Sequence, residues 1–440
     1  MKLISLAVLF LLSLLPTQAL AYPTVVVQSV EVSVPAESSG YVRDTEWLTM
    51  PTITNTDEVL NGLVAVNDGE NNYLAFSVTG AYTVDWGDGS ATESFASGVV
   101  AEHNFAFANL GVETTHTEGY RQAIVSVTMQ TPGTMTAIDL DERHSGVGNE
   151  RWQLGWMDVE ISGPSITSFA LQSNEAPMLL LKEFSILSNS ITSFSNMFNN
   201  CYSLQSIPLL DTSAGTSFSS MFRYCSSLQS IPLLDTSAGT SFSSMFFNCY
   251  SLQAIPLLDT SACTNFSYMF YYCSSLQSIP LLDTSAGTSF SNMFFNCYSL
   301  QAIPLLDTSA CTNFSYMFYY CSSLQSIPLL DTSAGTSFYR MFSYCYSLQG
   351  IPLLDTSAST NLSDMFYSCS SLQVGAMSGT ALSIKYHSAY LTTGAIVDIF
   401  NGLASVSGQT ITITGNIGVS GLSAADRLIA TDKGWVIVDA

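Results

Sequence analysis

A cysteine recurs every twenty-four residues in this 440-residue chain, at positions 201, 225, 249, 273, 297, 321, 345 and 369. The repeat is so regular that the 24 residues beginning at Cys249 occur again, without a change, from Cys297. A fixed period of this length indicates a solenoid, because one such unit cannot bury its apolar face without a neighbour. Residues 201–374 therefore predict seven stacked units, and the identical pair indicates a surface that was lengthened by copying.

Each unit divides into a strand-like half and a helix-like half. In the first unit, Leu204, Ile207 and Leu209 follow the spacing L-x-x-I-x-L of a leucine-rich-repeat strand. We expect these side chains, and equivalents such as Leu257, to point inward. Later apolar residues recur at i, i+3, i+4 and i+7, which indicates one face of a short helix. They are Phe218, Met221, Phe222 and Cys225.

The first residues predict export. Residues 1–21, MKLISLAVLFLLSLLPTQALA, combine a lysine, an apolar run and small residues at Ala19 and Ala21, which is the order of a signal peptide cleaved before Tyr22. The apolar run is shorter than the ~20 residues that a membrane-spanning helix needs. No later stretch is apolar and long enough to span a bilayer, so we expect no transmembrane segment after cleavage.

The rest of the chain predicts a mostly β protein with short helices. Residues 22–46 are a valine-rich leader or linker, and residues 47–135 alternate apolar and polar side chains between turn signals, which indicates a β-sandwich. Residues 136–200 predict a β-rich cap at the start of the solenoid. Residues 375–440 predict an α/β cap at its end, which the array needs because its last unit would otherwise expose apolar core to water.

Two stretches resemble known families. The repeats, with Met-Phe, then a cysteine, then SLQSIPLLDTS, resemble those of BspA-like leucine-rich repeat surface proteins over about residues 177–375. YTVDWGDGS at 82–90, with HNF at 103–105 and GYRQAIVSV at 119–127, is similar to the PKD-type immunoglobulin-like domain. The resemblance implies a secreted or cell-surface protein that adheres to a protein or glycan partner. Related repeats also occur in phage sequences, so a virion-attached receptor binder is the alternative.

The predicted binding ribbon consists of two columns on the strand-like half. A long exposed apolar surface indicates an interaction site, and these side chains alternate with the inward ones. The prolines are Pro208, Pro232, Pro256, Pro280, Pro304 and Pro328, and the leucines are Leu210, Leu234, Leu258, Leu282, Leu306 and Leu330. The alternative is that the leucine packs into the next coil while the proline only limits the length of the strand.

A third column is acidic and contains Asp211, Asp235, Asp259, Asp283, Asp307, Asp331 and Asp355. Like charges ~5 Å apart need compensation. Each carboxylate can accept hydrogen bonds from the Thr and Ser that follow it, as in an Asx turn. The alternative is calcium shared between the carboxylates of neighbouring units. The sequence implies no other cofactor.

The ten cysteines have two possible states. Export would permit disulfides. The periodic cysteines, however, lie on the inner face of the predicted helices, where neighbouring units are ~8 to 10 Å apart and a bridge needs less than ~7 Å. We therefore favour buried thiols, and we note that Cys263 and Cys311 stand outside the period.

Few other residues suggest a site. Asp85 and Asp88 lie in a Gly-rich turn that needs no cation to explain it. In DLDERH, we expect Asp139, Asp141 and Arg143 to share one solvated strand face. The four histidines at 103, 116, 144 and 387 are scattered and have no ligands at metal-site spacing.

Charge and composition exclude several functions. The formal charge of −23 would repel nucleic acid and anionic lipid. Residues 201–374 contain no His, Glu or Lys, so general acid-base catalysis has no residues there. We predict a binding protein rather than an enzyme, with a structural scaffold of a cell envelope or virion as the alternative.

Overall fold

The structure, a computed structural model, describes residues 43–69, 72–140, 142–147, 155–171, 180–187, 189–207, 210–386 and 389–439. The predicted signal peptide and most of the leader lie outside the described residues. The described part is mostly β, as predicted, with two α-helices. None of its helices combines the length and the apolar character that crossing a membrane requires.

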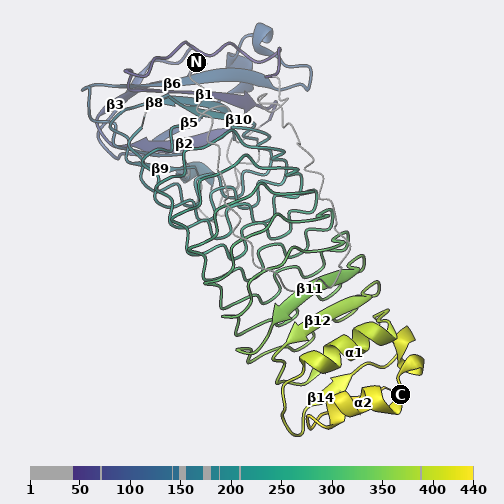
Figure 1. Cartoon of the computed structure of the whole chain (residues 1–440). Helices are drawn as coiled ribbons and strands as arrows, with labels where there is room; N and C mark the ends of the chain where they lie inside the picture. Colours follow the sequence, from purple (N-terminus) through teal and green to yellow (C-terminus); the bar gives the residue numbers. More distant parts are fainter. Residues whose placement is uncertain are drawn as a thin grey trace, which may run out of the picture. The chain divides into compact units, whose positions relative to one another are not determined.

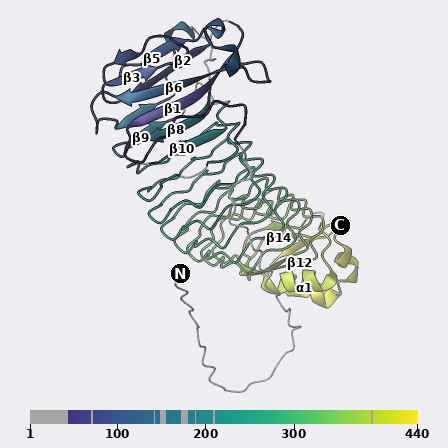
Figure 2. The same ribbon diagram turned by 90° about the horizontal axis from the view of Figure 1, so that it is seen from above.

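The described part of the chain begins with two β-sheets, whose strands lie side by side in Figures 1 and 2. The six-stranded sheet has the order β10-β8-β1-β6-β3-β4. Its strands are β1 (Val59–Val66), β3 (Tyr82–Asp85), β4 (Glu93–Phe95), β6 (Arg121–Met129), β8 (Trp156–Ser162) and β10 (Glu183–Ile186). The four-stranded sheet has the order β5-β2-β7-β9. Its strands are β2 (Tyr73–Val78), β5 (Ala101–Asn104), β7 (Ala137–Asp139) and β9 (Ser168–Ala170).

The two sheets bury their apolar faces against each other. Phe76 of β2 lies 6.3 Å from Tyr82 of β3 and 5.8 Å from Trp156 of β8, measured between ring centroids. A Cβ at Gly62 of β1 would lie 2.1 Å from the Trp156 ring, so glycine at this position lets the indole approach the strand backbone closely. Strands on both sides of residue 135 pair within the same sheets, so residues 47–135 and 136–200 share these two sheets.

The sheets continue directly into the array of coils. β8 and β10 pair in parallel, and Ile186 of β10 forms a parallel bridge to Leu210 of the first unit. Further parallel bridges then repeat at every unit, from Ser193 to Ser217 to Ser241 and on to Asn361. The predicted solenoid of 24-residue coils is therefore present, stacked in register as Figure 1 shows.

The helix-like half of each unit is not a helix, which corrects the prediction from spacing. Phe218, Met221, Phe222 and Cys225 are all fully buried, as expected. They are carried by consecutive tight turns, because Ser220 and Tyr224 have φ of 57° and 62° and interrupt any helical run. Every coil has two such residues four positions apart.

Neighbouring coils are joined in these turns by backbone hydrogen bonds. The Met221 N–H donates within its own coil to Phe218 O at 3.2 Å, whereas the Ser220 N–H donates to Ser243 O of the next coil at 2.9 Å. Along the turns, one N–H group bonds within its own coil and the next bonds to the neighbouring coil. Most N–H groups of the turns therefore have a hydrogen-bond partner. This double use of the backbone explains why turns replace the helix.

Buried rings form a stack through the array. Phe198, Phe222, Phe246, Phe270, Phe294, Phe318, Phe342 and Phe366 stack in sequence, with centroids 5.4–5.7 Å apart and planes within 8°. Phe184 of β10 packs edge-on at one end, 5.1 Å from Phe198. Tyr386 closes the other end, 4.9 Å from Phe366.

The C-terminal residues cover the last coil. β11 (Gly350–Asp355) and β12 (Val374–Ser378) pair in parallel, and β13 (Ile384–Lys385), β14 (Thr410–Thr412) and β15 (Val436–Val438) form a small parallel sheet. α1 (Thr393–Gly402) begins at the Thr392 cap and α2 (Ala424–Thr431) at a Ser423 capping box. The 3-10 helices are η1 (Phe107–Asn109), η2 (Val112–Thr114), η3 (Ser145–Val147) and η4 (Ile417–Gly421).

Candidate functional site

The most exposed apolar side chains of the array form one line, which we call the leucine column. Each of its leucines exposes more than half of its surface, from 55% at Leu353 to 67% at Leu233. The column consists of Leu233, Leu257, Leu281, Leu305, Leu329 and Leu353. Because neighbouring coils pair in register, these side chains lie one above another with about the 4.8 Å spacing of adjacent strands.

The predicted leucine ribbon was wrong by one residue. Leu210, Leu234, Leu258, Leu282, Leu306 and Leu330 are all buried, with 4% exposure or less, which is the alternative that placed this leucine in the packed interior. From Leu233 on, the residue before each buried leucine, expected to point inward as at Leu257, is the exposed one. Pro208 and Leu209 lie outside the described residues, and the prolines from Pro232 to Pro328 are half-buried.

The error follows from the period of this segment. In the second unit the buried side chains are Leu228, Ile231 and Leu234, at a spacing of three residues rather than two. Three residues per turn is the period of a polyproline-type extended chain, which the central proline favours by fixing its φ. Even where the structure forms a strand, in β11, the register of pairing shifts between Ile351 and Leu354.

Polar columns flank the leucine column. Exposed glutamines on one side form a backbone ladder, in which the N–H of each donates to the carbonyl of the preceding one, from Gln229 on Gln205 to Gln373 on Gln349, at 2.8–3.4 Å. The aspartates lie on the other side. The surface beside the leucines is thus polar, with negative charge on one side only.

The acidic column consists of Asx turns, the first of the two predicted alternatives. In all seven turns, Oδ1 of the aspartate accepts a hydrogen bond from the N–H of the serine two residues later, at 2.9–3.1 Å. The hydroxyls of Ser237 and Ser261 also donate to Oδ1 of Asp235 and Asp259, at 2.7 Å, and together with the N–H groups they hold the pKa of both aspartates below the ordinary value. In the part of the chain that the structure describes, no three His, Cys, Asp or Glu side chains are grouped closely enough to hold a metal ion.

A second ladder, which we call the aromatic column, lies on the turn half of the coils. It consists of Phe247, Tyr271, Phe295 and Tyr319, whose rings stack 4.4–4.5 Å apart. The Arg223 guanidinium lies 4.8 Å from the Phe247 ring and covers one end of the ladder. Because each ring faces its neighbours, the column shows solvent mainly ring edges and tyrosine hydroxyls.

All ten cysteines are buried free thiols. From Cys225 to Cys369, each periodic Sγ donates to a phenylalanine carbonyl of the preceding coil at 3.0–3.1 Å. Burial raises the pKa of the Cys263 thiol to about 11 and that of Cys311 to about 12. These thiols are packing groups rather than nucleophiles, because a nucleophilic cysteine needs a lowered pKa.

The Gly-rich turn of the N-terminal sheets is held by protein groups. Asp85 accepts from the Gly87 N–H at 3.0 Å and Asp88 from the Ser90 N–H at 3.0 Å, as an Asp-Gly turn predicts. Asp88 also contacts Nε2 of His103 at 2.9 Å, and the His103 ring stacks on Trp86. Asp141 and His387 lie outside the described residues.

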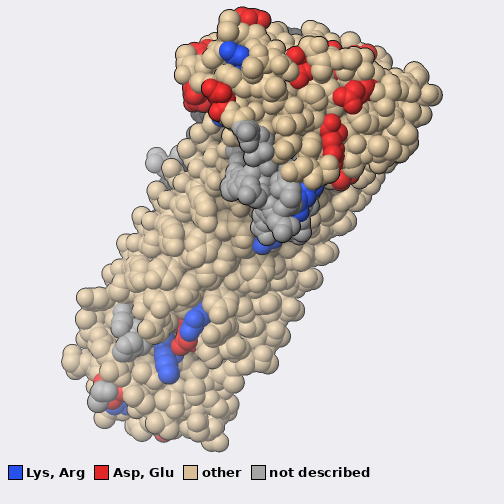
Figure 3. All heavy atoms as spheres, turned by 180° about the vertical axis from the view of Figure 1, so that it is seen from behind, with Lys and Arg blue, Asp and Glu red and all other residues tan. Residues whose placement is uncertain are grey.

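An acidic cluster occupies the β8–β10 edge of the six-stranded sheet. Arg43 Nε lies 3.0 Å from Asp158 and 3.8 Å from Glu183, while Glu160 shares their side of the sheet. Burial and the charge of Asp158 raise the pKa of Glu183 to about 7. On the face drawn in Figure 3, acidic side chains gather over these sheets and few charged side chains lie over the array.

The fold and surface define a solenoid protein of 24-residue coils, whose exposed features are ladders of leucine, aspartate, glutamine and aromatic side chains. The family described as "Mycoplasma protein of unknown function, DUF285" matches residues 187–282 and 264–379. No curated protein is detectably similar in sequence. One similar solved structure is "Plant peptide hormone receptor RGFR1 in complex with RGF2", at 12% identity and a TM-score of 0.24. The match covers 63% of this chain and 59%, less than two thirds, of that one.

Proposed function

We propose that this is a recognition protein that binds a protein or glycan partner through the leucine column, without catalysis. The observation that carries the proposal is the solvent exposure of six aligned leucines, each of which exposes more than half of its surface. Their combined apolar surface is on the order of 500 Å², the size of the largest patch on a typical monomer, which is often functional. Solvent exposure of this area is unfavourable, and a bound partner would remove it from water.

The proposal extends to location. The signal-peptide pattern of residues 1–21 and the resemblance to BspA-like and PKD-type proteins support action outside the cell or at its surface. Sequencing the N-terminus of protein recovered from the medium or cell surface tests this directly. Export predicts a mature chain that begins at Tyr22.

Screening the mature chain against immobilised glycans and surface proteins tests the binding proposal. The double variant Leu257→Ser and Leu305→Ser removes two rungs of the leucine column in two units of identical sequence. The matched control is Tyr250→Ser with Tyr298→Ser, which removes exposed apolar surface from the turn half of the same coils. Loss of binding in the leucine variant alone supports the proposal, and equal retention in both variants contradicts it.

A second candidate is a structural scaffold of an envelope or virion. Its support is that a second copy would present leucines at the same spacing, so that two columns could interlock. Analytical ultracentrifugation of the mature chain distinguishes the two roles. Stable self-association that Leu257→Ser with Leu305→Ser abolishes favours the scaffold, and a monomer at all concentrations contradicts it.

A further inference from the structure

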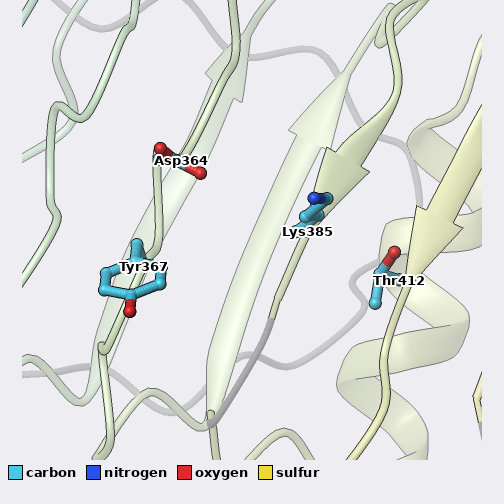
Figure 4. Close-up of a pocket in the computed structure, with 4 residues that line it drawn as sticks. All are labelled: Asp364, Tyr367, Lys385 and Thr412. Atoms are coloured by element: carbon cyan, nitrogen blue, oxygen red, sulfur yellow. The ribbon is translucent and has the colours of Figure 1, made fainter.

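A cavity of about 320 Å³ lies where the last coil meets the C-terminal sheet. Asp364 and Tyr367 line it from the coil, and Lys385 of β13 and Thr412 of β14 line it from the sheet. Figure 4 shows the four side chains around one space. Lys385 and Thr412 are register partners on neighbouring parallel strands, so the sheet holds the ammonium and the hydroxyl side by side. The volume is within the range of small-molecule sites.

The charges in this cavity are only partly balanced. Nε and Nη2 of Arg340 both donate to Oδ2 of Asp364 at 3.2 Å. Within the described residues, Oδ1 of Asp364 takes part in no hydrogen bond, and the exposed Lys385 has no ion-pair partner. The cavity therefore offers a carboxylate acceptor whose charge is matched by Arg340, and one ammonium whose charge is not matched.

An aromatic wall completes the cavity. The Tyr367 side chain is 43% exposed, and Tyr344 contacts its ring at 5.3 Å and 72°, so a large part of the ring remains open. An open tyrosine ring offers apolar surface for the C–H face of a flat, polar ligand, and its hydroxyl offers a hydrogen bond. The cavity thus combines a ring, a hydroxyl, a carboxylate oxygen and an ammonium.

The ligand that matches these four groups is a sugar ring with one negative charge. The ring of Tyr367 can stack on a pyranose face, and Lys385 can pair with a carboxylate. Oδ1 of Asp364 and the Thr412 hydroxyl can form hydrogen bonds with sugar hydroxyls. A nucleic acid or polyphosphate would bring several charges to a single ammonium on a chain of net charge −23. An acidic peptide could pair with Lys385 and donate N–H groups to Asp364, but it would bring no ring of hydroxyl-bearing carbons to the face of Tyr367.

We propose that this cavity binds a saccharide unit carrying one carboxylate, such as a uronic acid. The inference names a ligand class for the recognition protein and so rests on the proposed function, but it uses residues separate from the leucine column. Lys385 pairs with the carboxylate, Tyr367 stacks on the ring, and Asp364 and Thr412 bind hydroxyls. Arg340 positions the Asp364 carboxylate.

Isothermal titration of the mature chain with methyl glucuronide, methyl glucoside and an acetylated, amidated glutamate tests the assignment. We expect the glucuronide to bind about tenfold more tightly than the glucoside, because a hydrogen bond to a charged group contributes about 1.5 kcal/mol. Lys385→Gln should remove this tenfold difference, and Tyr367→Ala should weaken both sugars. The matched control is Arg223→Gln, which removes one positive charge from a distant coil and should change affinity by less than about twofold.

Three results would overturn the inference. They are equal affinity for glucuronide and glucoside, equal affinity for the glutamate derivative and the glucuronide, and equal loss in Lys385→Gln and Arg223→Gln. Circular dichroism of each variant separates lost binding from lost folding. A partner that depends on the leucine column, found without glucuronide binding, would refute this site and leave the proposed function intact. Glucuronide binding with no partner for the leucine column would support this site and contradict the proposed role of that column.

Discussion

At the scale of single residues, adjacent leucines in each unit have opposite environments. Leu257 is 60% exposed, whereas Leu258 is 1% exposed, although the two differ by one position in the repeat. The difference arises because buried side chains in this segment recur every three residues, which places Ile255 and Leu258 inside and leaves Leu257 out. The pair therefore provides a direct test of the packing.

The first prediction concerns this pair. Leu258→Ala should lower the free energy of unfolding by about 2 to 5 kcal/mol, because it leaves a cavity in a packed core. Leu257→Ala should change it by about 0.5 kcal/mol or less, because the side chain is mostly in water. Urea denaturation of both variants measures the difference, and equal losses would contradict the three-residue period.

The second prediction concerns the thiols. All ten cysteines should be unreactive toward a thiol reagent in the native protein, because each is buried and none has a lowered pKa. In denaturant without reductant, ten thiols should titrate. A lower count under those conditions would show disulfides and refute the free state.

At the scale of elements, turn geometry determines the backbone conformation of the coils, and local charge determines the behaviour of the β8–β10 edge. The consecutive turns tolerate positive φ at residues as different as Ser220, Tyr268 and Arg340, because their amides pair with the next coil. The β8–β10 edge is under a different constraint, since several carboxylates there share one nearby guanidinium.

The third prediction concerns pH and this edge. The pKa of Glu183 is raised from 4.5 to about 7, so between these values the unfolded chain releases a proton that the folded protein keeps. Stability should therefore be greatest below about pH 4.5 with respect to this group and fall as the pH rises to about 7, by roughly 3 kcal/mol. Asp158 and Glu160, whose pKa values are also raised by burial, act in the same direction.

Thermal unfolding from about pH 5 to about pH 8 provides the measurement. Glu183→Gln should flatten the pH dependence and stabilise the protein at the alkaline end. The control, Glu118→Gln, alters an exposed carboxylate in the same domain and should leave the slope as it is. An unchanged slope in Glu183→Gln would refute the assignment.

At the scale of the whole molecule, the array is a sum of equivalent neighbours. Each coil contacts the next through the same hydrogen bonds and ring stacks, so its surroundings do not depend on how many coils follow. The unchanged repeat at residues 249–272 and 297–320 is consistent with this, since a copied unit meets the same neighbour.

The fourth prediction is that deletion of residues 249–296 leaves a folded protein. Asn248 would then precede Cys297, whose unit is identical to the one that it normally precedes. Small-angle scattering should show an array shorter by about 10 Å, two coils at ~4.8 Å each. In contrast, a chain that ends at Gln373 loses Tyr386, exposes Phe366 and Leu372, and should aggregate. A soluble, monomeric truncation would contradict the capping role.

The sequence alone determined the period, the solenoid, the buried Phe, Met and Cys positions and the Asx turns, because each of these depends on local spacing repeated many times. The tertiary structure decided which leucine of each pair faces water, that turns replace the helix, and that Lys385 and Thr412 meet Asp364 and Tyr367 at one cavity. These outcomes depend on how one coil rests on the next and on strands far apart in the chain. A single unit's pattern does not contain that information, since a shift of one residue in packing exchanges Leu257 with Leu258.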